Sequence, residues 1–233
     1  MLPENQSSDV FLESHRRLYP SIRNPNWLIL RQRRKIFALG VSQYLGRNLR
    51  VLDLGGRLQP YRPLLGSRVA QYISIDLEIT QLVDVAGSGE ALPFRDAQFD
   101  FVICTQVLEY CHDPHQVAAE ISRVLREGGI AFISAPAVFV RDHDDEYWRF
   151  LPSGLRYIFR DFQAVEVVAE GNSLVGFVRT VNLFIASFAR PRVLAQILSW
   201  TVIPALNIMG FLIEGLGRNN DSFTANYSCW AHR

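Results

Sequence analysis

Short apolar runs that end in glycine or in an acidic residue constrain this chain more than any other feature. Leu49–Leu54 runs into two glycines, and Gln71–Asp76 ends in a carboxylate. Phe99–Thr105 is the clearest run of this kind, and a segment with helical periodicity follows it. Apolar runs that alternate with helices are typical of parallel strands buried on both faces. The pattern predicts an α/β fold with an open, mostly parallel sheet and helices on both faces.

The order of the remaining elements follows from turn and cap residues. Asp113 can cap a helix that has Pro114 in its first turn, and Gly128-Gly129 is predicted to end it. A strand is then expected at Ile130–Ser134. The later elements expected are a helix at 152–162, a strand at 164–169, helices within 174–217 and a last strand at 223–230.

The alternation of strands and helices is predicted to begin at residue 49, so that 1–48 form an N-terminal arm and helix and 49–233 form the main domain. Residues 1–25 are polar and proline-containing, so we expect a poorly ordered arm, and a broken apolar stripe predicts a helix at 26–45. Eight basic residues lie from Arg16 to Arg47, although the net charge of the chain is only +1. A net charge this close to zero argues against a protein whose main function is to bind nucleic acid.

Cysteine usage indicates a reducing compartment. The three cysteines, Cys104, Cys111 and Cys229, form no CxxC pair and are odd in number, which fits neither a disulfide framework nor a zinc site. The segment Met1–Val10 is polar, so no secretory signal is predicted. The expected localisation is therefore cytoplasmic.

Polar residues follow the predicted strands at their carboxyl ends, where open parallel sheets bind ligands. Asp53 precedes the turn of Gly55 and Gly56, and glycine lets the backbone approach a ligand closely. An acid in that turn repels a pyrophosphate and suits a cation or an amine. Asp76 ends the next strand, where a carboxylate accepts hydrogen bonds from ribose hydroxyls in dinucleotide folds.

Taken together, these motifs resemble the class I S-adenosylmethionine-dependent methyltransferases, in particular the small-molecule branch of methyltransferase type 11. The resemblance rests on VLDLGG, ISID, EALPFRDAQFDFVICTQVLEY and VLREGG, and it covers roughly residues 49–170 plus the last strand. It implies a Rossmann-like sheet of seven strands with an antiparallel last strand. It also implies S-adenosylmethionine as the cofactor and methyl transfer by direct in-line displacement.

The resemblance assigns eight residues to the cofactor. They line the methionine end (Asp53, Gly55, Gly56), the ribose (Asp76), the adenine (Ser88, Gly89, Glu90) and the sulfonium (Gln106). The chain departs from the family pattern after Gly56, because Arg57–Tyr61 replaces the later glycines of the loop. The Pro-Tyr-Arg continuation resembles a subgroup linked to glycan or lipid biosynthesis.

The loop at 141–150 is expected to receive the acceptor, because it follows the fifth strand of the fold. It combines acidic and aromatic residues, although a solvated charge run is the alternative interpretation. An oxygen nucleophile needs a general base. His143 is the first candidate, with Asp144 or Asp145 to orient it, and His112 is the second. No metal is predicted, because a lone histidine among acids needs none.

The apolar stretch at 174–217 is predicted to be a helical insertion before the last strand. Val193–Ile213 has no charge and is long enough to span a bilayer, but Pro204 and several polar residues interrupt it. We expect helices that cover the sheet or the acceptor site, with membrane-surface contact as the second interpretation and a span as the third. The flanking Arg190, Arg192 and Arg218 favour anionic headgroups.

The sequence thus predicts S-adenosylmethionine-dependent methyl transfer, at oxygen, to a small-molecule, glycan-related or lipid-linked acceptor. The alternative is a methyltransferase-like fold that binds without catalysis. A nicotinamide-dependent reductase is disfavoured, because GGRLQP does not supply the G-x-G-x-x-G turn. No nucleic-acid partner is expected, and the sequence does not predict an oligomeric state.

Overall fold

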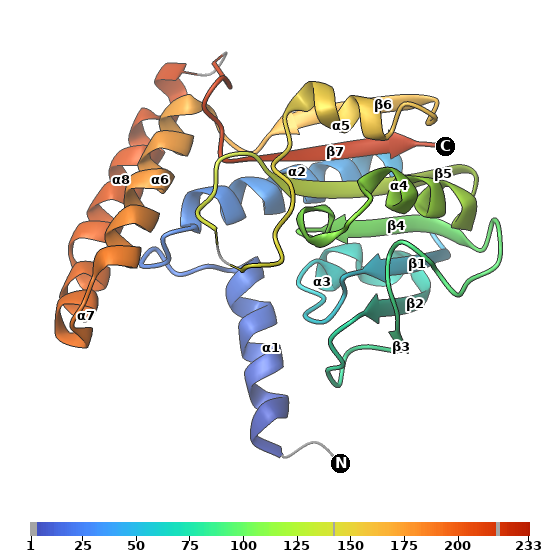
Figure 1. The fold of residues 1–233 in the computed structure, drawn as a ribbon, viewed down its shortest axis with the longest axis horizontal. Helices are drawn as coiled ribbons and strands as arrows, with labels where there is room; N and C mark the ends of the chain where they lie inside the picture. Colours follow the sequence, from blue (N-terminus) through green and yellow to red (C-terminus); the bar gives the residue numbers. More distant parts are fainter. Residues whose placement is uncertain (1–3, 142, 218–219) are drawn as a thin grey trace.

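The computed structural model of the chain describes residues 4–141, 143–217 and 220–233. A seven-stranded sheet lies at its centre (Figure 1). The strands are β1 (Leu49–Leu54), β2 (Val69–Asp76), β3 (Val85–Ala86), β4 (Phe99–Thr105), β5 (Leu125–Pro136), β6 (Ala164–Ala169) and β7 (Asn226–His232). The α-helices are α1 (Glu4–Leu18), α2 (Trp27–Tyr44), α3 (Arg62–Leu65), α4 (Pro114–Val124), α5 (Pro152–Ile158), α6 (Ser173–Phe188), α7 (Arg192–Trp200) and α8 (Val202–Ile213). Three short 3-10 helices are η1 (Gly66–Arg68), η2 (Leu108–Tyr110) and η3 (Glu214–Gly217).

The sheet confirms the predicted Rossmann-like architecture. Its strand order is β3-β2-β1-β4-β5-β7-β6. The first five strands pair in parallel, whereas β7 is antiparallel to both β5 and β6. The chain builds outward from β1 to β3 and then returns to place β4 beside β1. Ligands in such sheets bind at the carboxyl ends of the strands at this reversal.

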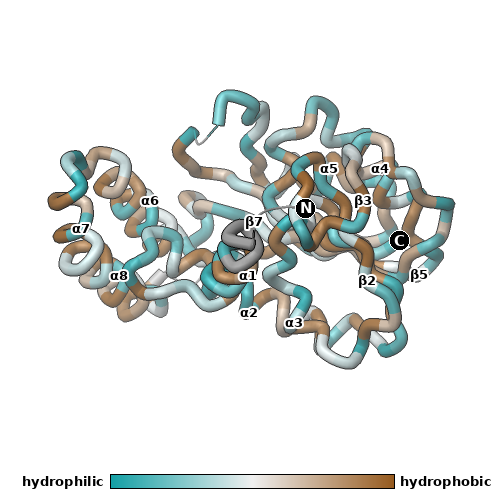
Figure 2. The backbone as a smooth tube through the Cα atoms, turned by 90° about the horizontal axis from the view of Figure 1, so that it is seen from below, coloured by the Kyte–Doolittle hydropathy of each residue, from teal (hydrophilic) through white to brown (hydrophobic). Residues whose placement is uncertain are grey.

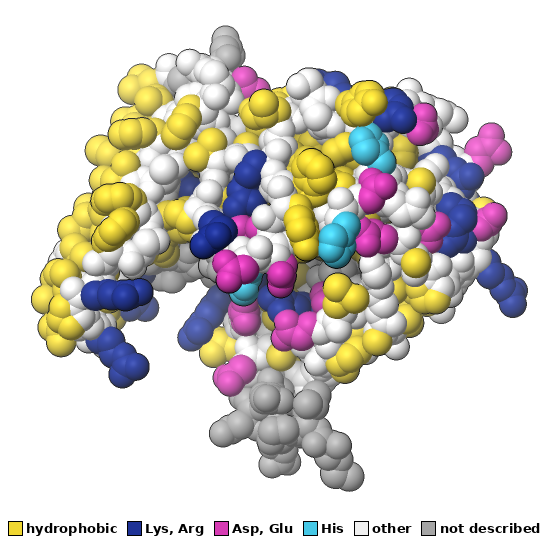
Figure 3. All heavy atoms as spheres, viewed as in Figure 1, with side chains coloured by type: hydrophobic (Ala, Val, Ile, Leu, Met, Phe, Trp, Pro, Cys, Tyr) yellow, Lys and Arg dark blue, Asp and Glu magenta, His cyan; other side chains and the backbone are white. Residues whose placement is uncertain are grey.

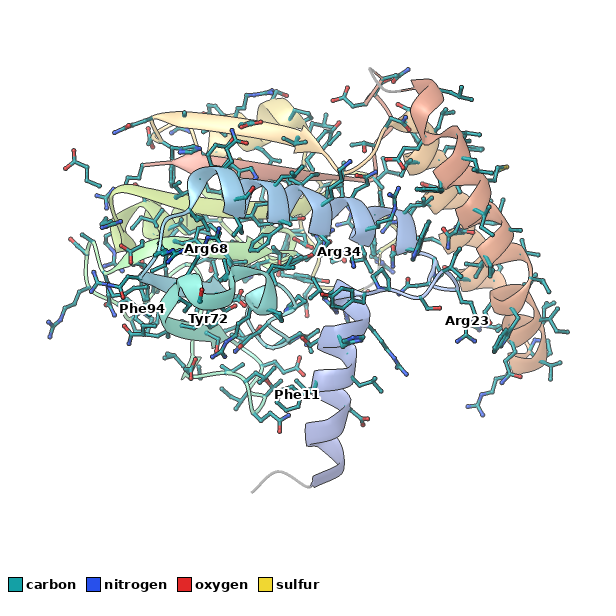
Figure 4. All side chains as sticks on the ribbon, turned by 180° about the vertical axis from the view of Figure 1, so that it is seen from behind. Phe11, Arg23, Arg34, Arg68, Tyr72 and Phe94 are labelled. Atoms are coloured by element: carbon teal, nitrogen blue, oxygen red, sulfur yellow. The ribbon has the colours of Figure 1, made fainter. Side chains whose placement is uncertain are left out.

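Helices cover both faces of the sheet because the central strands are apolar on both sides (Figures 1 and 4). Val102 of β4 belongs to the buried cluster that includes Ile121 of α4. Phe101, its neighbour in the strand, belongs to the cluster on the other face, with Phe37 of α2 and Trp230 of β7. This alternation is what a strand buried on both sides requires.

The prediction of a poorly ordered arm over residues 1–25 is wrong for most of its length, because α1 spans Glu4–Leu18. This stretch contains no proline, and Arg17 forms an ion pair with Glu13 one turn earlier. Arg34 of α2 holds the end of α1, since its guanidinium lies over the Tyr19 ring and donates to the carbonyl oxygen of Leu18. The first three residues lie outside the described ranges.

The predicted boundary between α4 and the next strand also differs from the structure. Asp113 caps α4 as expected, accepting from the backbone N–H groups of His115 and Gln116. The helix ends at Val124, however, and β5 begins at once. Strand pairing explains the early end, because Leu125 already pairs with Phe99. The remaining expected elements are present with shifted ends; the last strand, for example, begins at Asn226 rather than at residue 223.

The insertion between β6 and β7 is helical, as predicted. Helix α6 runs away from the sheet, and α7 and α8 return along it (Figures 1 and 2). Helix α6 packs against α8, and both contact α2. The insertion therefore stands beside one end of the sheet and rests on α2.

The close contact of Gly40 on α2 with Trp230 on β7 leads to a prediction about stability. A Cβ atom at Gly40 would lie 2.0 Å from Cζ2 of the Trp230 ring, which is itself packed in the core. We expect Gly40→Ala to lower the free energy of unfolding by about 1–3 kcal/mol, because the ring cannot move without repacking its neighbours.

Urea denaturation measures this effect, with Gly46→Ala as the matched control. A Cβ atom at Gly46 would meet nothing within 4 Å. The control is expected to match or slightly exceed the wild type in stability. Equal stability of the two variants would contradict the close packing of α2 on Trp230.

Candidate cofactor site

The carboxyl ends of three adjacent strands bring the predicted cofactor residues to one edge of the sheet. In the register of the sheet, Leu54 of β1 pairs with Ile75 of β2 and with Cys104 of β4. Asp76 and Gln106 lie at the same edge, one and two residues beyond these pairs. The ends of these three strands thus bring together residues that are far apart in sequence.

The loop after β1 approaches this edge through its backbone. Gly55 has a φ of +77°, and a Cβ atom there would lie 2.2 Å from Cγ2 of Val107. The backbone N–H groups of Gly55 and Gly56 donate to the carbonyl oxygen of Ile75, at 2.8 and 3.2 Å. A Cβ at Gly56 would also be too close to the Asp53 carbonyl oxygen. Both glycines are therefore required to hold the loop against β2 and η2.

Asp53 is a buried carboxyl group at the centre of the edge, only 4% exposed. Burial is the main cause that raises its pKa, to about 7, and the nearby charge of Asp76 adds to the effect. The hydroxyl of Tyr72 donates to the Asp53 carboxylate and, together with the charge of Arg62, opposes the shift. A cationic group placed here would favour the ionised carboxylate. An α-amino group fits this requirement.

Asp76 presents a carboxylate at the end of β2. One of its oxygens accepts a hydrogen bond of 2.8 Å from the backbone N–H of Glu78, which fixes the orientation of the side chain. An ionised carboxylate can accept several more hydrogen bonds. Asp76 is therefore suited to bind neighbouring hydroxyl groups, as a ribose would supply.

The segment Ser88–Glu90 lies beyond β3, and its side chains serve the local fold. The Ser88 hydroxyl accepts from the backbone N–H of Glu90, and a Cβ at Gly89 would crowd the Leu54 side chain. The Glu90 carboxylate accepts a 2.8 Å hydrogen bond from the backbone N–H of Asp113. Glu90 therefore braces the start of α4, a task that the sequence analysis did not assign to it.

Gln106 is held by a polar network that the sequence analysis missed. Its side-chain amide donates to the Ser134 carbonyl oxygen and to Oδ1 of Asn226, each at 3.2 Å. The Asn226 amide of β7 donates to the Ser134 hydroxyl of β5, and that hydroxyl donates to the buried carboxylate of Glu170. These residues are distant in sequence and belong to no local motif, so pattern reasoning had no signal for them.

The predicted acceptor loop does lie against the carboxyl end of β4. The backbone N–H of Tyr147 donates to the carbonyl oxygen of Glu109 in η2 at 2.8 Å. The indole N–H of Trp148 donates to the carbonyl oxygen of Cys111, also at 2.8 Å. Glu109 is itself buried, and burial raises the pKa of its carboxyl group to about 7. These contacts attach an aromatic loop next to the cofactor edge.

The two candidate bases have different surroundings on this loop. His112 places Nε2 3.1 Å from the Tyr147 hydroxyl oxygen and Nδ1 3.9 Å from a Glu90 carboxylate oxygen. His143, which is exposed as His112 is, meets the Tyr110 ring edge-on. Figure 3 shows histidine and acidic side chains gathered on this face.

The predicted partner of His143 is engaged elsewhere. The carboxylate of Asp144 lies 3.6 Å from the Arg141 guanidinium rather than beside His143. Asp142, which precedes His143 in the loop, lies outside the described residues. The structure therefore brings together His112, Tyr147 and Glu90, whereas Asp144 pairs with Arg141.

Three further observations delimit the site. Within the described ranges, no three His, Cys, Asp or Glu side chains form a group that could hold a metal ion. The three cysteines are free and buried. A hollow of about 290 Å³ lies between α4 and the segment after α5, and none of the predicted cofactor residues lines it. The strand edge remains the location where the predicted residues meet.

Comparisons with known proteins agree with this location. Residues 52–133 match the family model described as "Methyltransferase domain", which includes Asp53, the glycine turn, Asp76 and Gln106. A biotin biosynthesis bifunctional protein of Cellvibrio japonicus is 32% identical over 96 residues, 36% of this chain and 19% of that one. An uncharacterized methyltransferase of Mycolicibacterium gilvum is 29% identical over 100 residues, 38% of this chain and 39% of that one. The chain thus spans well under half the length of these relatives.

Solved structures with little sequence identity share the fold. A SAM-dependent methyltransferase from Archaeoglobus fulgidus matches with a TM-score of 0.52 and 16% identity, over 96% of this chain and 99% of that one. The cyclase SpnF matches with a TM-score of 0.52 and 17% identity, over 85% of this chain and 80% of that one. The match over residues 52–133, the sheet order and the strand-end residues make this chain similar to the class I S-adenosylmethionine-dependent methyltransferases, and that similarity implies S-adenosylmethionine as the cofactor.

Proposed function

We propose that the protein transfers a methyl group from S-adenosylmethionine to a small-molecule, glycan-related or lipid-linked acceptor. One observation carries the proposal: Asp53, the Gly55 turn and Asp76 occupy the ends of adjacent parallel strands within the matched segment. A buried carboxylate, a turn free of side chains and a second carboxylate suit the amino acid end and the ribose of this cofactor.

The residues at the edge fit the cofactor chemically. Asp53 would hold the α-amino group, because a cation there offsets the burial of the carboxylate. Asp76 would accept hydrogen bonds from the ribose hydroxyls. The cofactor, when bound, supplies an electrophilic methyl group on a sulfonium. Ser88 and Gly89 remain our candidates for the adenine end, and Gln106 for the sulfonium end.

The protein contributes position, enclosure and proton removal. In-line displacement requires the nucleophile to be held at the methyl group and water to be kept away. Tyr147 and Trp148, which donate hydrogen bonds to the carbonyl oxygens of Glu109 and Cys111, would cover the acceptor side.

We assign the base to His112 ahead of His143. The carboxylate of Glu90 stands on the Nδ1 side of His112, and the Tyr147 hydroxyl contacts Nε2. A carboxylate on the Nδ1 side can orient the ring, so that Nε2 can accept a proton from an acceptor hydroxyl. His143 becomes the second candidate for the general base.

A cytoplasmic location fits this proposal, since the three cysteines are buried and no disulfide joins them. The apolar insertion favours a lipid-linked acceptor within the proposed range. A transfer assay with methyl-labelled S-adenosylmethionine and cell extract, separated into organic and aqueous phases, distinguishes lipid-linked from soluble acceptors. Label in neither phase would contradict methyl transfer to these classes.

Binding without catalysis is the second candidate function. The fold alone does not establish methyl transfer, since SpnF, a cyclase, has a similar fold. The Arg57–Tyr61 continuation also lacks the later glycines of the family loop. Tight cofactor binding together with no label transfer to any extract fraction would favour this second function.

The first prediction for this site concerns Asp76. Removal of its carboxylate leaves the ribose hydroxyls without a charged acceptor, so we expect Asp76→Ala to weaken S-adenosylmethionine binding by about 1.5–3 kcal/mol. Isothermal titration measures the change. Glu78→Ala is the matched control, because Glu78 lies two residues away in the same loop and pairs with Arg57 at the surface. No binding by the wild type at millimolar cofactor would refute the assignment.

The second prediction concerns pH and Asp53. A carboxyl group with a pKa of about 7 must ionise to hold an amino group, so cofactor affinity should rise roughly tenfold or more from pH 5.5 to 7.5. In Asp53→Asn the affinity should be low and independent of pH. Titrations at several pH values, in buffers of different ionisation enthalpy, detect the proton release.

Protein stability supplies the control for the same variant. A carboxyl group whose pKa is raised by folding lowers stability as pH rises from its ordinary pKa of about 4 to about 7. Asp53→Asn should therefore raise the free energy of unfolding of the unliganded protein at pH 8, by on the order of 1–3 kcal/mol. If Asp53→Asn were less stable than the wild type and still bound the cofactor, both the raised pKa of Asp53 and its role in cofactor binding would be contradicted.

The third prediction separates the two histidines. With an oxygen acceptor in hand, His112→Ala should lower turnover by roughly 10²–10⁴-fold and leave cofactor affinity unchanged. His143→Ala serves as the comparison and should have a much smaller effect. The reverse order would restore His143 as the base.

A further inference from the structure

The helical insertion exposes an unusual amount of apolar surface. Of the 25 large hydrophobic side chains that are exposed among the described residues, 12 lie between Phe177 and Leu216. On α6, Phe177, Phe184 and Phe188 fall on one stripe at helical spacing. Figure 3 shows the hydrophobic side chains gathered over this part of the molecule. Patches of this kind mark interaction sites.

The opposite side of the insertion is packed on protein. Asn207 of α8 is fully buried, and its amide donates to the carbonyl oxygens of Ile22 and Asn24 before α2. Asn182 of α6 donates to Asn207. A Cβ at Gly210 would collide with the Leu28 side chain of α2. One face of the insertion is thus held rigidly to the domain, and the other faces outward.

This attachment favours contact with a membrane surface over a membrane span. Arg192–Leu216 is long and apolar enough to cross a bilayer, and only 17% of its most apolar window is buried. The chain enters the insertion from β6 and leaves it into β7, both strands of the same sheet. Because α8 also holds buried amides against the N-terminal segment, it cannot leave the domain without unpairing them.

The charged residues of the insertion indicate which kind of membrane surface it could bind. Ser173–Ile213 contains three arginines and no acidic residue. Arg179 is buried, whereas Arg190 and Arg192 are exposed where α6 turns into α7. Arg23, also exposed, stacks its guanidinium 3.9 Å from the centre of the Trp200 ring and lies beside the foot of the insertion in Figure 4. Arg218 lies outside the described residues.

We propose that the outer face of α6, α7 and α8 docks on an anionic phospholipid surface. The stripe of Phe177, Phe184 and Phe188 would enter the interface, with Trp200 at the headgroup level beside the exposed arginines. A second copy of the chain fits this face less well, because the same arginines would meet and repel. This inference does not depend on the methyl transfer proposed above.

The insertion is also joined to the acceptor loop. Arg179 of α6 donates to the Val138 carbonyl oxygen at 2.8 Å and to the Asn26 side chain at 2.9 Å, and it lies over the Phe139 ring. Val138 and Phe139 begin the loop that follows β5. A lipid surface bound to α6 would therefore lie at a fixed position relative to the acceptor side of the site.

Vesicle co-sedimentation of the full chain tests the proposal. We expect binding to vesicles of phosphatidylcholine mixed with phosphatidylglycerol, weaker binding to phosphatidylcholine alone, and release at high salt. The double variant Arg190→Glu and Arg192→Glu should lower partitioning by roughly tenfold or more. The charge-matched control reverses Arg95 and Arg160, which lie in the β3–β4 loop and after α5.

The apolar part of the face is tested separately. Phe188→Ser and Trp200→Ser should together lower partitioning by roughly tenfold, whereas Tyr157→Ser on α5, which is similarly exposed, should have little effect. All of these residues are exposed, so circular dichroism should be unchanged.

The other outcomes overturn the proposal. No vesicle binding, or binding that the Arg95 and Arg160 control also loses, would exclude this face as the lipid contact. Release only by detergent would indicate a span. A dimer in light scattering that the Phe188 and Trp200 variants dissociate, without vesicle binding, would assign the face to a second copy. Cofactor titration of the same variants should be normal, which separates this result from failure of the methyltransferase proposal.

Discussion

The buried ion pair of Arg33 and Glu170 is the interaction on which the rest of the structure depends. Arg33 extends from α2, and its Nε contacts both carboxylate oxygens of Glu170, at 2.8 and 2.9 Å. The Glu170 carboxylate also accepts from the hydroxyls of Ser134 on β5 and Ser228 on β7. A buried pair is stable only when such hydrogen bonds offset desolvation. It therefore fixes α2, β5 and β7 relative to one another at the end of β6.

The same network reaches both functional surfaces. Through Ser134 and Asn226 it positions Gln106 at the carboxyl end of β4, beside the cofactor edge. Through α2 it holds the helical insertion, because α6 and α8 pack on that helix. Loss of one partner would leave a charge uncompensated in the interior, at a cost of about 3–5 kcal/mol. The site and the apolar face thus share one rigid support.

Sequence reasoning could identify the candidate site residues that are encoded locally. Asp53, the glycine turn and Asp76 each follow an apolar run, so strand-end position and residue type could be recognised without the fold. The network around Glu170 joins residues more than a hundred positions apart, and no local pattern reveals it. His143 was ranked above His112 for the same reason, because the contacts that favour His112 come from Glu90 and Tyr147 in other segments. Strand pairing, not helix propensity, decided where α4 ends.

A crystal structure of the protein with S-adenosylhomocysteine tests the central claim most directly. The account predicts that the Asp76 carboxylate lies within hydrogen-bond distance of both ribose hydroxyls. It also predicts the α-amino group beside Asp53, with Gly55 against the amino acid end. A nucleoside bound at another edge of the sheet, or one with its ribose away from Asp76, would contradict the account.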